Sequence, residues 1–348
     1  MPGRTAIGLD IGTSGVRAAE LSYGRGGVTL EKFGQVALPE GAVRDGEVVD
    51  RAAVVDALKT LWKASGFKGK KVALGVANQR VVVRQVDLPW MPLAELKASL
   101  PLQVQDYLPL PVDECLIDFH VTEEVVDGET RLLRGLLVAA AREMVSANVA
   151  AVEAAGLRAT GVDLTSFAVL RSVGKPFGDV ATEALVDIGA RISNLVIHSG
   201  GQPRFVRVLL SGGQDVTDAI AERLGLSAPL AESVKRGSLE DLSEQDRSLA
   251  DSAVDLMLEV FVDDIRSSMD YYAASHPAFP VERIVLSGGG SLLHGVAERL
   301  EAVTRKPVVP ADPTAGLHVG RTGLDEQQLA TVQPLAAVPV GLALGVIS

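Results

Sequence analysis

Two segments half a chain apart carry the same short pattern, and this repeat constrains the fold more than any other feature of the sequence. The segment Ile7–Leu21 reads IGLDIGTSGVRAAEL, and the segment that begins at Ala184 reads ALVDIGARISNLVIH. Each has apolar residues, then Asp-Ile-Gly, a small residue and a second apolar run. Two apolar strands joined by a glycine turn predict a β-hairpin, and two such hairpins predict a duplicated α/β chain with a cleft between its halves.

The turn after Asp-Ile-Gly has the chemistry of an anion site. A tight glycine turn points successive backbone N–H groups at one spot, and a Cβ there would block close approach. Two hairpins that face each other would hold a polyphosphate from both sides, with Asp10 and Asp187 meeting beside it. A hydrated Mg²⁺ between the carboxylates and the phosphates would remove their repulsion. A single Asp-Ile-Gly is also what an ordinary hairpin with an exposed Asp shows, and only the repeat favours the phosphate site.

A third element is the glycine run LSGGGSLLHG at Leu286–Gly295. Gly288, Gly289 and Gly290 stand between a predicted strand and a predicted helix, where a flat ligand can press against the backbone. The spacing G-x-G-x-x-G of dinucleotide-binding turns is absent. A tight strand-to-helix turn without a ligand explains this run equally well.

A fourth element is LAESVKRG at Leu230–Gly237. Glu232 and Lys235 are three residues apart and share one face of a predicted helix. Glu232 would accept hydrogen bonds from ribose hydroxyls, and Lys235 would lie along a base. The alternative is an ordinary surface ion pair.

Composition narrows the classes of protein that fit. The chain has 348 residues, enough for two domains, and its formal net charge is −11, which argues against a general nucleic-acid surface. The single cysteine, Cys115, excludes an intrachain disulfide and is consistent with a reducing compartment.

Asp10 interrupts the apolar run near the N-terminus, so no secretory signal is expected. The uncharged stretch Gln327–Ser348 is long enough for a membrane span, but its two prolines favour a short buried helix at VPVGLALGVIS.

Apolar periodicity and turn residues predict alternating strands and helices in both halves. Strands are predicted at 5–10, 15–21, 28–37, 71–76, 80–86, 183–188, 192–198 and 203–211, and helices at about 51–65, 142–155, 214–224, 229–236 and 245–275.

These four elements, in this order, resemble the actin-like ATPase superfamily, which includes actin, the sugar kinases, MreB and FtsA. The resemblance implies duplicated actin-like (ribonuclease H-like) domains that bind ATP and Mg²⁺. It assigns Asp10 and Asp187 to Mg²⁺ through water, and it assigns nucleotide contacts to the following residues: Asp10, Gly12, Thr13, Ser14, Arg17, Asp187, Gly189, Glu232, Lys235, Gly288, Gly289 and Gly290.

The middle of the chain resembles one family more narrowly. The stretch VVVRQVDLPWMPLAELKASLPLQVQDYLPLPVDECLIDFHV, followed by LLVAAAREMV and GGQDVTDAIAERLG, is similar to the type IV pilus assembly protein PilM. This family has a small subdomain, IC, in a position that it shares with FtsA. The implied division is 1–80 for the first part of subdomain IA, 81–160 for IC, 161–180 for the return to IA, 181–335 for IIA and IIB, and 336–348 for a C-terminal helix that packs back on IA.

The PilM resemblance implies a function as well as a fold. We expect an ATP-binding cytoplasmic adaptor of the type IV pilus assembly machinery that binds the cytoplasmic N-terminal peptide of the inner-membrane protein PilN, alongside other pilus machine components. Its place at the inner face of the cytoplasmic membrane would come from this partner, with neither direct membrane insertion nor nucleic-acid binding. The alternatives are a filament-forming ATPase like FtsA or MreB, and a phosphotransferase of the sugar-kinase type.

Three positions bear on hydrolysis. Arg17 stands where the superfamily usually has Lys, and Arg keeps the charge and can hold a phosphate. Arg191 follows Asp-Ile-Gly-Ala, where it would either clamp a phosphate or crowd the attacking water. Asp163 is the candidate for the base that orients this water, although it fits equally well as a cap of the next helix. We therefore expect nucleotide binding with weak or absent hydrolysis.

The partner peptide is expected in a groove between subdomains IA and IC. The candidate lining residues lie in stretches interrupted by proline, which suit a groove for an extended peptide: they are Leu88, Trp90, Met91, Leu93 and Tyr107. Asp113, Glu114 and Asp118 would attract a basic peptide. The alternative is that Leu88, Trp90 and Met91 close the core of IC.

Overall fold

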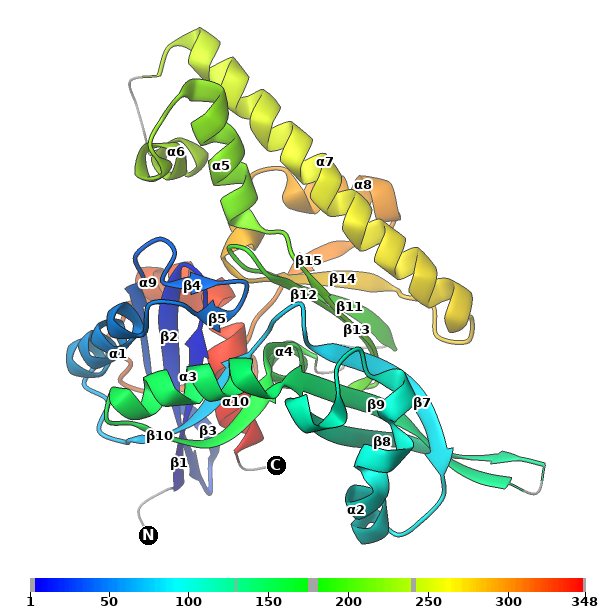
Figure 1. The fold of residues 1–348 in the computed structure, drawn as a ribbon. Helices are drawn as coiled ribbons and strands as arrows, with labels where there is room; N and C mark the ends of the chain where they lie inside the picture. The colour runs from blue at the N-terminus through cyan, green and yellow to red at the C-terminus, as the bar shows by residue number, and fades with distance from the viewer. Residues whose placement is uncertain (1–3, 129, 175–180, 239–241, 347–348) are drawn as a thin grey trace.

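The computed structural model describes residues 4–128, 130–174, 181–238 and 242–346, and Figure 1 shows them as two α/β halves with a smaller sheet beside the first half. The described strands of the first half form a sheet in the order β10-β6-β1-β2-β3-β16. Their bounds are Arg4–Ile11 (β1), Gly15–Gly24 (β2), Gly27–Ala37 (β3), Lys71–Val76 (β6), Arg158–Leu164 (β10) and His318–Val319 (β16).

The second half has a sheet in the order β13-β12-β11-β14-β15. Its strands span Thr182–Ile188 (β11), Ser193–Ser199 (β12), Gln202–Leu209 (β13), Arg283–Ser287 (β14) and Val308–Pro310 (β15). Every residue of β11 is buried, as expected for a strand inside a sheet that is covered on both faces.

The two large sheets share one topology, which confirms the predicted duplication. In the first, the antiparallel strands β1, β2 and β3 are followed by β6, which runs parallel to β1. In the second, β11, β12 and β13 are followed by β14, which runs parallel to β11. Asp10 is paired with Arg17 in the first hairpin, and Asp187 is paired with Asn194 in the second.

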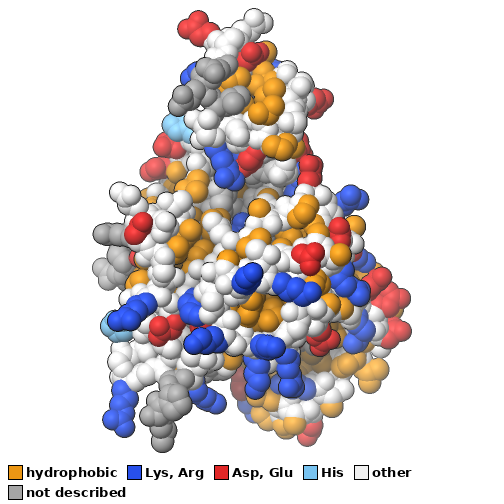
Figure 2. Space-filling model, turned by 90° about the vertical axis from the view of Figure 1, so that its left-hand side faces the viewer, with side chains coloured by type: hydrophobic (Ala, Val, Ile, Leu, Met, Phe, Trp, Pro, Cys, Tyr) orange, Lys and Arg blue, Asp and Glu red, His pale blue; other side chains and the backbone are white. Residues whose placement is uncertain are grey.

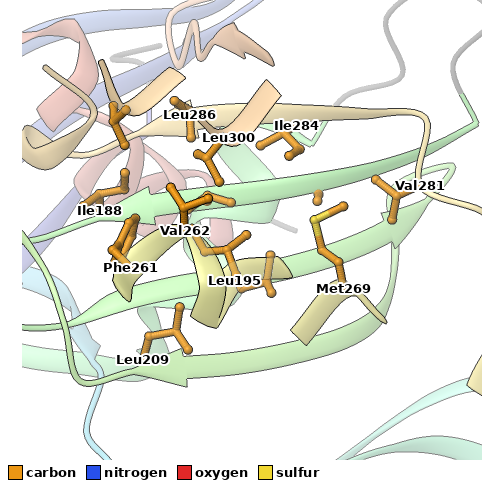
Figure 3. Packing of buried hydrophobic residues seen from close by; sticks show 14 of the residues in the cluster. Ile188, Leu195, Leu209, Phe261, Val262, Met269, Val281, Ile284, Leu286 and Leu300 are labelled. Atoms are coloured by element: carbon orange, nitrogen blue, oxygen red, sulfur yellow. The ribbon is translucent and has the colours of Figure 1, made fainter. Parts of the chain in front are cut away.

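The long helix α7 (Glu244–Ser275) closes one face of the second sheet. Phe261, Val262 and Met269 from this helix pack against Leu195 and Ile284 from the strands (Figure 3). Ser243 caps the helix by accepting a hydrogen bond from the backbone N–H of Asp246 at 3.0 Å. The remaining helices of this half are α5 (Gly213–Leu224), α6 (Ala228–Lys235) and α8 (Val296–Thr304).

A separate antiparallel sheet in the order β7-β9-β8 lies beside the first half. Its strands are Val82–Pro89 (β7), Cys115–Asp127 (β8) and Thr130–Ala141 (β9), and α2 (Leu93–Gln103) buries Leu96 and Leu100 against it. The next segments, α3 (Arg142–Ala154) and β10, belong to the six-stranded sheet and its core, because Ala151 and Val152 pack with Leu9 and Leu74. The subdomain boundaries given above stay a prediction.

The remaining elements cover the first half. Helix α1 (Arg51–Ser65) begins at the cap Asp50 and ends at Gly66, as predicted. The other bounds are Val43–Arg44 (β4), Glu47–Val48 (β5), Thr165–Val173 (α4), Glu326–Val332 (α9) and Ala337–Gly345 (α10).

Helix α10 is buried as the sequence predicted, and glycines let it approach its neighbours closely. A Cβ on Gly8 of β1 would lie 2.0 Å from the carbonyl oxygen of Pro339, and a Cβ on Gly341 would lie 1.8 Å from that of Ala168 in α4. Val340 and Ala343 are fully buried against the sheet. The C-terminal helix therefore connects β1 with α4, the helix that leads into the second half.

Within the described ranges, no single helix combines the length and the apolar composition needed to cross a membrane. One pair of segments, Gln327–Leu335 and Ala337–Gly345, meets the criteria together but bends by 71° between them.

We predict that Gly341→Ala destabilises the protein by about 1–3 kcal/mol, because the added methyl group overlaps the Ala168 carbonyl and forces α10 away from α4. Helix propensity alone predicts the opposite sign. The measurement is urea unfolding, with Gly161→Ala as the control, since a Cβ at Gly161 meets no atom within 4 Å. Equal stability of the Gly341 variant and the wild type would contradict this packing.

Candidate functional site

The two Asp-Ile-Gly turns have the same hydrogen bond at equivalent positions. The Gly12 N–H donates to the Gly15 carbonyl at 3.0 Å, and the Gly189 N–H donates to the Ile192 carbonyl at 3.1 Å. A Cβ on Gly189 would lie 2.3 Å from the Ile192 oxygen, so the second turn requires glycine for steric reasons alone. The amides of these glycines close the turns, and the N–H groups at the turn tips belong to the residues that follow them.

Both turns face one cleft between the two halves. Its volume is about 1580 Å³. The residues of the predicted set that line it are Asp10, Gly12, Thr13, Ser14, Arg17, Asp187, Gly189, Glu232, Lys235, Gly288, Gly289 and Gly290. The structure thus brings together every residue to which the sequence assigned a nucleotide contact.

The carboxylates of Asp10 and Asp187 are strongly perturbed by burial. Burial raises the pKa of Asp187 to about 6, and the charge of Asp10 adds to this increase, while a hydrogen bond from the Ser287 hydroxyl at 2.7 Å opposes it. Burial also raises the pKa of Asp10, and the Arg17 guanidinium, 3.5 Å from its Oδ2, partly offsets that increase. A cation between the two carboxylates would relieve both effects.

The donor set fits Mg²⁺ better than a metal held by protein alone. Among the described residues, no group of three or more His, Cys, Asp or Glu side chains is placed to hold an ion. Mg²⁺ keeps several waters and uses one or two carboxylates together with substrate phosphates. Asp10 and Asp187, each two residues before one of the two glycine turns that line the cleft, provide two carboxylates of this kind.

Asn194 is a site residue that the sequence analysis missed. Its side chain hydrogen-bonds to Asp187, and its Oδ1 accepts from the hydroxyls of Ser166 at 2.8 Å and Thr165 at 3.2 Å. Asn194 lies 4% exposed and occupies the position equivalent to Arg17. The repeat that aligns Asp10 with Asp187 also aligns Arg17 with Asn194, so the alignment of the two segments could have identified Asn194 as a site residue. This buried chain of hydrogen bonds ties Asp187 to the beginning of α4.

The glycine run is required by packing as well as by access to the cleft. Gly288 has a φ of +81°, and its N–H donates to the Pro334 carbonyl at 2.8 Å. A Cβ on Gly288 would lie 2.3 Å from the Ile188 oxygen, and a Cβ on Gly290 would lie 2.2 Å from the Ile188 side chain. The run therefore rests directly on the strand that carries Asp187.

Glu232 and Lys235 are part of the cleft wall. The Lys235 ammonium lies 2.5 Å from the Glu232 carboxylate and donates to the Gly213 carbonyl and the Thr217 hydroxyl, both at 2.8 Å. These bonds join α6 to the first turn of α5. The Lys235 side chain is only 12% exposed, which distinguishes this pair from an ordinary surface ion pair.

Arg191 turns toward α5. Its guanidinium contacts the carboxylates of Asp215, at 2.7 Å, and Asp218. The backbone N–H groups of Gly213 and Gln214 donate to the carbonyls of Gly189 and Ala190 at 2.9 and 2.7 Å. The second turn is therefore fixed to the beginning of α5 by both backbone and side-chain bonds.

Asp163 is the predicted residue that the structure does not bring to the cleft. It forms an ion pair with Arg171 of α4, and its Oδ1 accepts from the backbone N–H of Leu164. Asp163 and Arg171 both line a second cavity, of about 640 Å³.

This second cavity is a largely apolar groove between two sheets. Its walls come from the edge strands β8 and β10, from α4 and from the turn between β12 and β13. Its lining includes Leu116, Asp118, His120, Val162, Phe167 and Arg171.

The residues predicted to line a peptide groove do not line this cavity: they are Leu88, Trp90, Met91, Leu93 and Tyr107. Asp118, which was predicted to attract a basic peptide, does lie in its wall. Leu88 is 2% exposed and packs under α2 with Leu96, so for Leu88 the core alternative is the one observed. Trp90 is 41% exposed, and its ring lies under the Arg131 guanidinium at 4.2 Å.

Comparison with known proteins identifies the family. The family model described as type IV pilus assembly protein PilM matches residues 8–346. The chain belongs to the PilM family. A solved PilM–PilN type IV pilus biogenesis complex contains a chain that is 29% identical to this PilM-family chain, with a TM-score of 0.86 and full coverage of both chains.

More distant relatives confirm the predicted actin-like fold. An MreB of Spiroplasma citri bound to ADP superposes with a TM-score of 0.52 at 12% identity, covering 99% of this chain and 98% of its own. FtsA of Streptococcus pneumoniae is 26% identical over 250 residues, which are 66% of this chain and 54% of FtsA. FtsA of Bacillus subtilis is 21% identical over 255 residues, 66% of this chain and 57% of FtsA. The chain thus spans about half the length of the curated relatives it matches.

The raised pKa of Asp187 predicts a specific dependence of stability on pH. The folded carboxyl keeps its proton up to about pH 6, and the unfolded one releases it near pH 4, so the free energy of unfolding falls as the pH rises between these values. Asp187→Asn removes this ionisation. We expect the variant to gain up to about 3 kcal/mol over the wild type above pH 6, and to lose that advantage below pH 4.

The measurement is urea unfolding across this pH range without Mg²⁺ or nucleotide. Asp251→Asn, at an exposed position on α7, is the control and should follow the wild type. A stability difference between Asp187→Asn and the wild type that does not change with pH would refute the burial argument.

Proposed function

We propose that this chain is an ATP-binding adaptor of the type IV pilus assembly machinery, and that it works in the cytoplasm. The observation that carries the nucleotide part is the equivalence of the two turns. They close with the same hydrogen bond, face one cleft, and follow the two largely buried carboxylates Asp10 and Asp187. The membership in the PilM family carries the assembly part.

The backbone N–H groups of Gly12 and Gly189 are used within the turns. In this proposal the backbone N–H groups at the turn tips, of Thr13, Ser14 and Ala190, therefore donate to the phosphates. Asp10 and Asp187 hold hydrated Mg²⁺, which neutralises phosphate charge when bound. Arg17, beside Asp10, adds a cation at the phosphate end of the cleft.

The base end of the cleft is formed by different elements. Glu232 accepts from the ribose hydroxyls, Lys235 lies along the base, and the run Gly288–Gly290 presents its backbone to the ring. These residues lie in the same cleft wall as the second turn, which supports their assignment to one ligand.

Weak hydrolysis follows from the same geometry. Asp163 is paired with Arg171 at the groove, so it does not supply a base in the cleft. Arg191 is engaged by Asp215 and Asp218, which supports a role in fixing the second turn rather than in activating water. The proposed state of the adaptor is therefore one that binds ATP and turns it over slowly.

The partner site in this proposal is the groove between β8 and β10. Among the described strands, both lie at the edge of their sheet, so the backbone groups on their outer side have no neighbouring strand along the groove. An extended peptide binds such an edge by main-chain hydrogen bonds and places alternate side chains in apolar pockets. The solved PilM–PilN complex supports the cytoplasmic N-terminal peptide of a PilN-like inner-membrane protein as the occupant.

We expect Asp10→Ala to weaken Mg-ATP binding by about a hundredfold, because it removes one of two carboxylates that hold the ion. The protein should stay folded, since the pKa of Asp10 is raised and its charge is costly without a cation. Calorimetric titration measures the affinity, and Asp251→Ala is the control. A folded Asp10→Ala protein with wild-type ATP affinity would remove the nucleotide proposal.

We expect Val162→Arg to abolish binding of a synthetic peptide with the partner's N-terminal sequence, for which the wild type should have an affinity of about 1 μM. Val162 is 38% exposed and lines the groove, so a larger charged side chain obstructs the β10 edge without burying a charge. Val126→Arg is the matched control, because Val126 is a 70% exposed valine on β8 that does not line the groove. ATP affinity should be unchanged in both variants, and equal peptide affinity in both would place the peptide elsewhere.

A further inference from the structure

The face of the first half that carries α1 has a charge opposite to that of the whole chain. The segment Arg51–Lys71 contains six basic side chains and one carboxylate, Asp56, while the formal net charge of the protein is −11. Figure 2 shows Lys and Arg side chains gathered over the lower half of this face. We call the following exposed residues the basic face: Lys59, Lys63, Lys68, Lys70, Lys71 and Arg158.

The contacts of the fold make this face continuous. Lys59 and Lys63 are one turn apart on α1, and the indole N–H of Trp62 in the same helix donates to the Gly69 carbonyl at 2.8 Å. The backbone N–H of Arg158 donates to the Lys70 carbonyl at 2.7 Å, and Arg158 pairs with Lys71 across β10 and β6. The helix end, the loop and two strand starts are thus held in one surface.

The side chains of the basic face have no ion-pair partner within 4 Å in the described part of the chain. None of the ion pairs found among the described residues includes a member of the basic face. Neighbouring like charges cost stability. A chain with 44 acidic residues thus keeps this face positive in spite of an energetic penalty.

The kind of side chain distinguishes between possible partners. Five of the six residues are Lys, which is depleted at protein–protein interfaces, whereas Arg is enriched there. The structure describes all of Arg51–Lys71, and none of the large hydrophobic side chains in this segment is exposed. The segment therefore lacks the apolar anchor that protein interfaces use. It also lacks an exposed aromatic ring on which nucleic-acid bases could stack. Lys ammonium groups are hydrated point charges, which suit a diffuse layer of phosphates.

We propose that the basic face docks on the anionic phospholipid headgroups of a membrane. The contact is electrostatic and peripheral, with no insertion into the bilayer. This lipid contact goes beyond the proposed adaptor function. It rests on that function in one respect, because binding to the membrane-embedded partner brings the protein to the membrane surface. Peptide capture and lipid contact together then define how the adaptor is oriented at the membrane.

The test is co-sedimentation of the full chain, without partner peptide, with vesicles of phosphatidylcholine alone or mixed with phosphatidylglycerol. We expect binding only to the mixed vesicles, and a steep loss as the salt concentration rises. The combined variant Lys63→Gln, Lys68→Gln, Lys70→Gln should bind about a hundredfold more weakly, since each basic residue near an anionic surface contributes about fivefold.

A matched control removes the same charge elsewhere. Arg223→Gln, Arg247→Gln and Arg321→Gln combined changes three exposed residues outside the basic face, and it should bind like the wild type apart from a small effect of net charge. No binding to mixed vesicles at low salt, or equal loss in both triple variants, would overturn the proposal.

Two further outcomes are informative. Association of the protein with itself at low salt, lost in the basic-face variant and without vesicle binding, would identify a second copy as the occupant and overturn the lipid proposal. Peptide affinity in solution is measured separately and should be unchanged in the basic-face variant. A failure of the lipid contact is therefore distinguishable from a failure of the adaptor function.

Discussion

Two carboxylates that line one cleft and are largely withdrawn from solvent are the constraint around which this protein is built. Asp10 and Asp187 stand at the ends of equivalent buried strands, and burial raises the pKa of both. Their neighbours reduce this cost by hydrogen bonds and charge: Arg17 for Asp10, and Ser287 and Asn194 for Asp187. These neighbours do not remove the whole free-energy cost of ionising the two carboxylates. A bound cation can relieve the part that remains.

The two candidate sites share one structural element. Helix α4 begins at Thr165 and Ser166, which hydrogen-bond to Asn194 beside Asp187. The same helix contributes Phe167 and Arg171 to the groove, and α10 packs against it through Gly341. Any displacement of α4 therefore moves parts of the cleft and of the groove together.

Much of the fold was predictable because the repeat is local and periodic. The Asp-Ile-Gly spacing identified both hairpins, and the strand predicted at 71–76 is β6 with the same bounds. The helix predicted at about 245–275 is α7, Glu244–Ser275. Buried strands and capped helices carry their signals within a few residues, which is why they could be read one segment at a time.

The partner groove and the role of individual polar residues were not predictable in this way. Leu88 and Trp90 were predicted to line a groove because their stretch is interrupted by proline, yet α2 packs over Leu88, and Arg131 covers Trp90 from the neighbouring strand. Asp163 was predicted to follow a strand as a catalytic base would, but it lies within β10, and its partner Arg171 on the next helix holds it at the groove. The duplicated strands, their turns and the carboxylates at their ends could be inferred from the sequence, since they depend on neighbours in the chain. Which edge strands face each other and which charges are paired is visible only in the folded chain, because these features depend on contacts between segments far apart in the sequence.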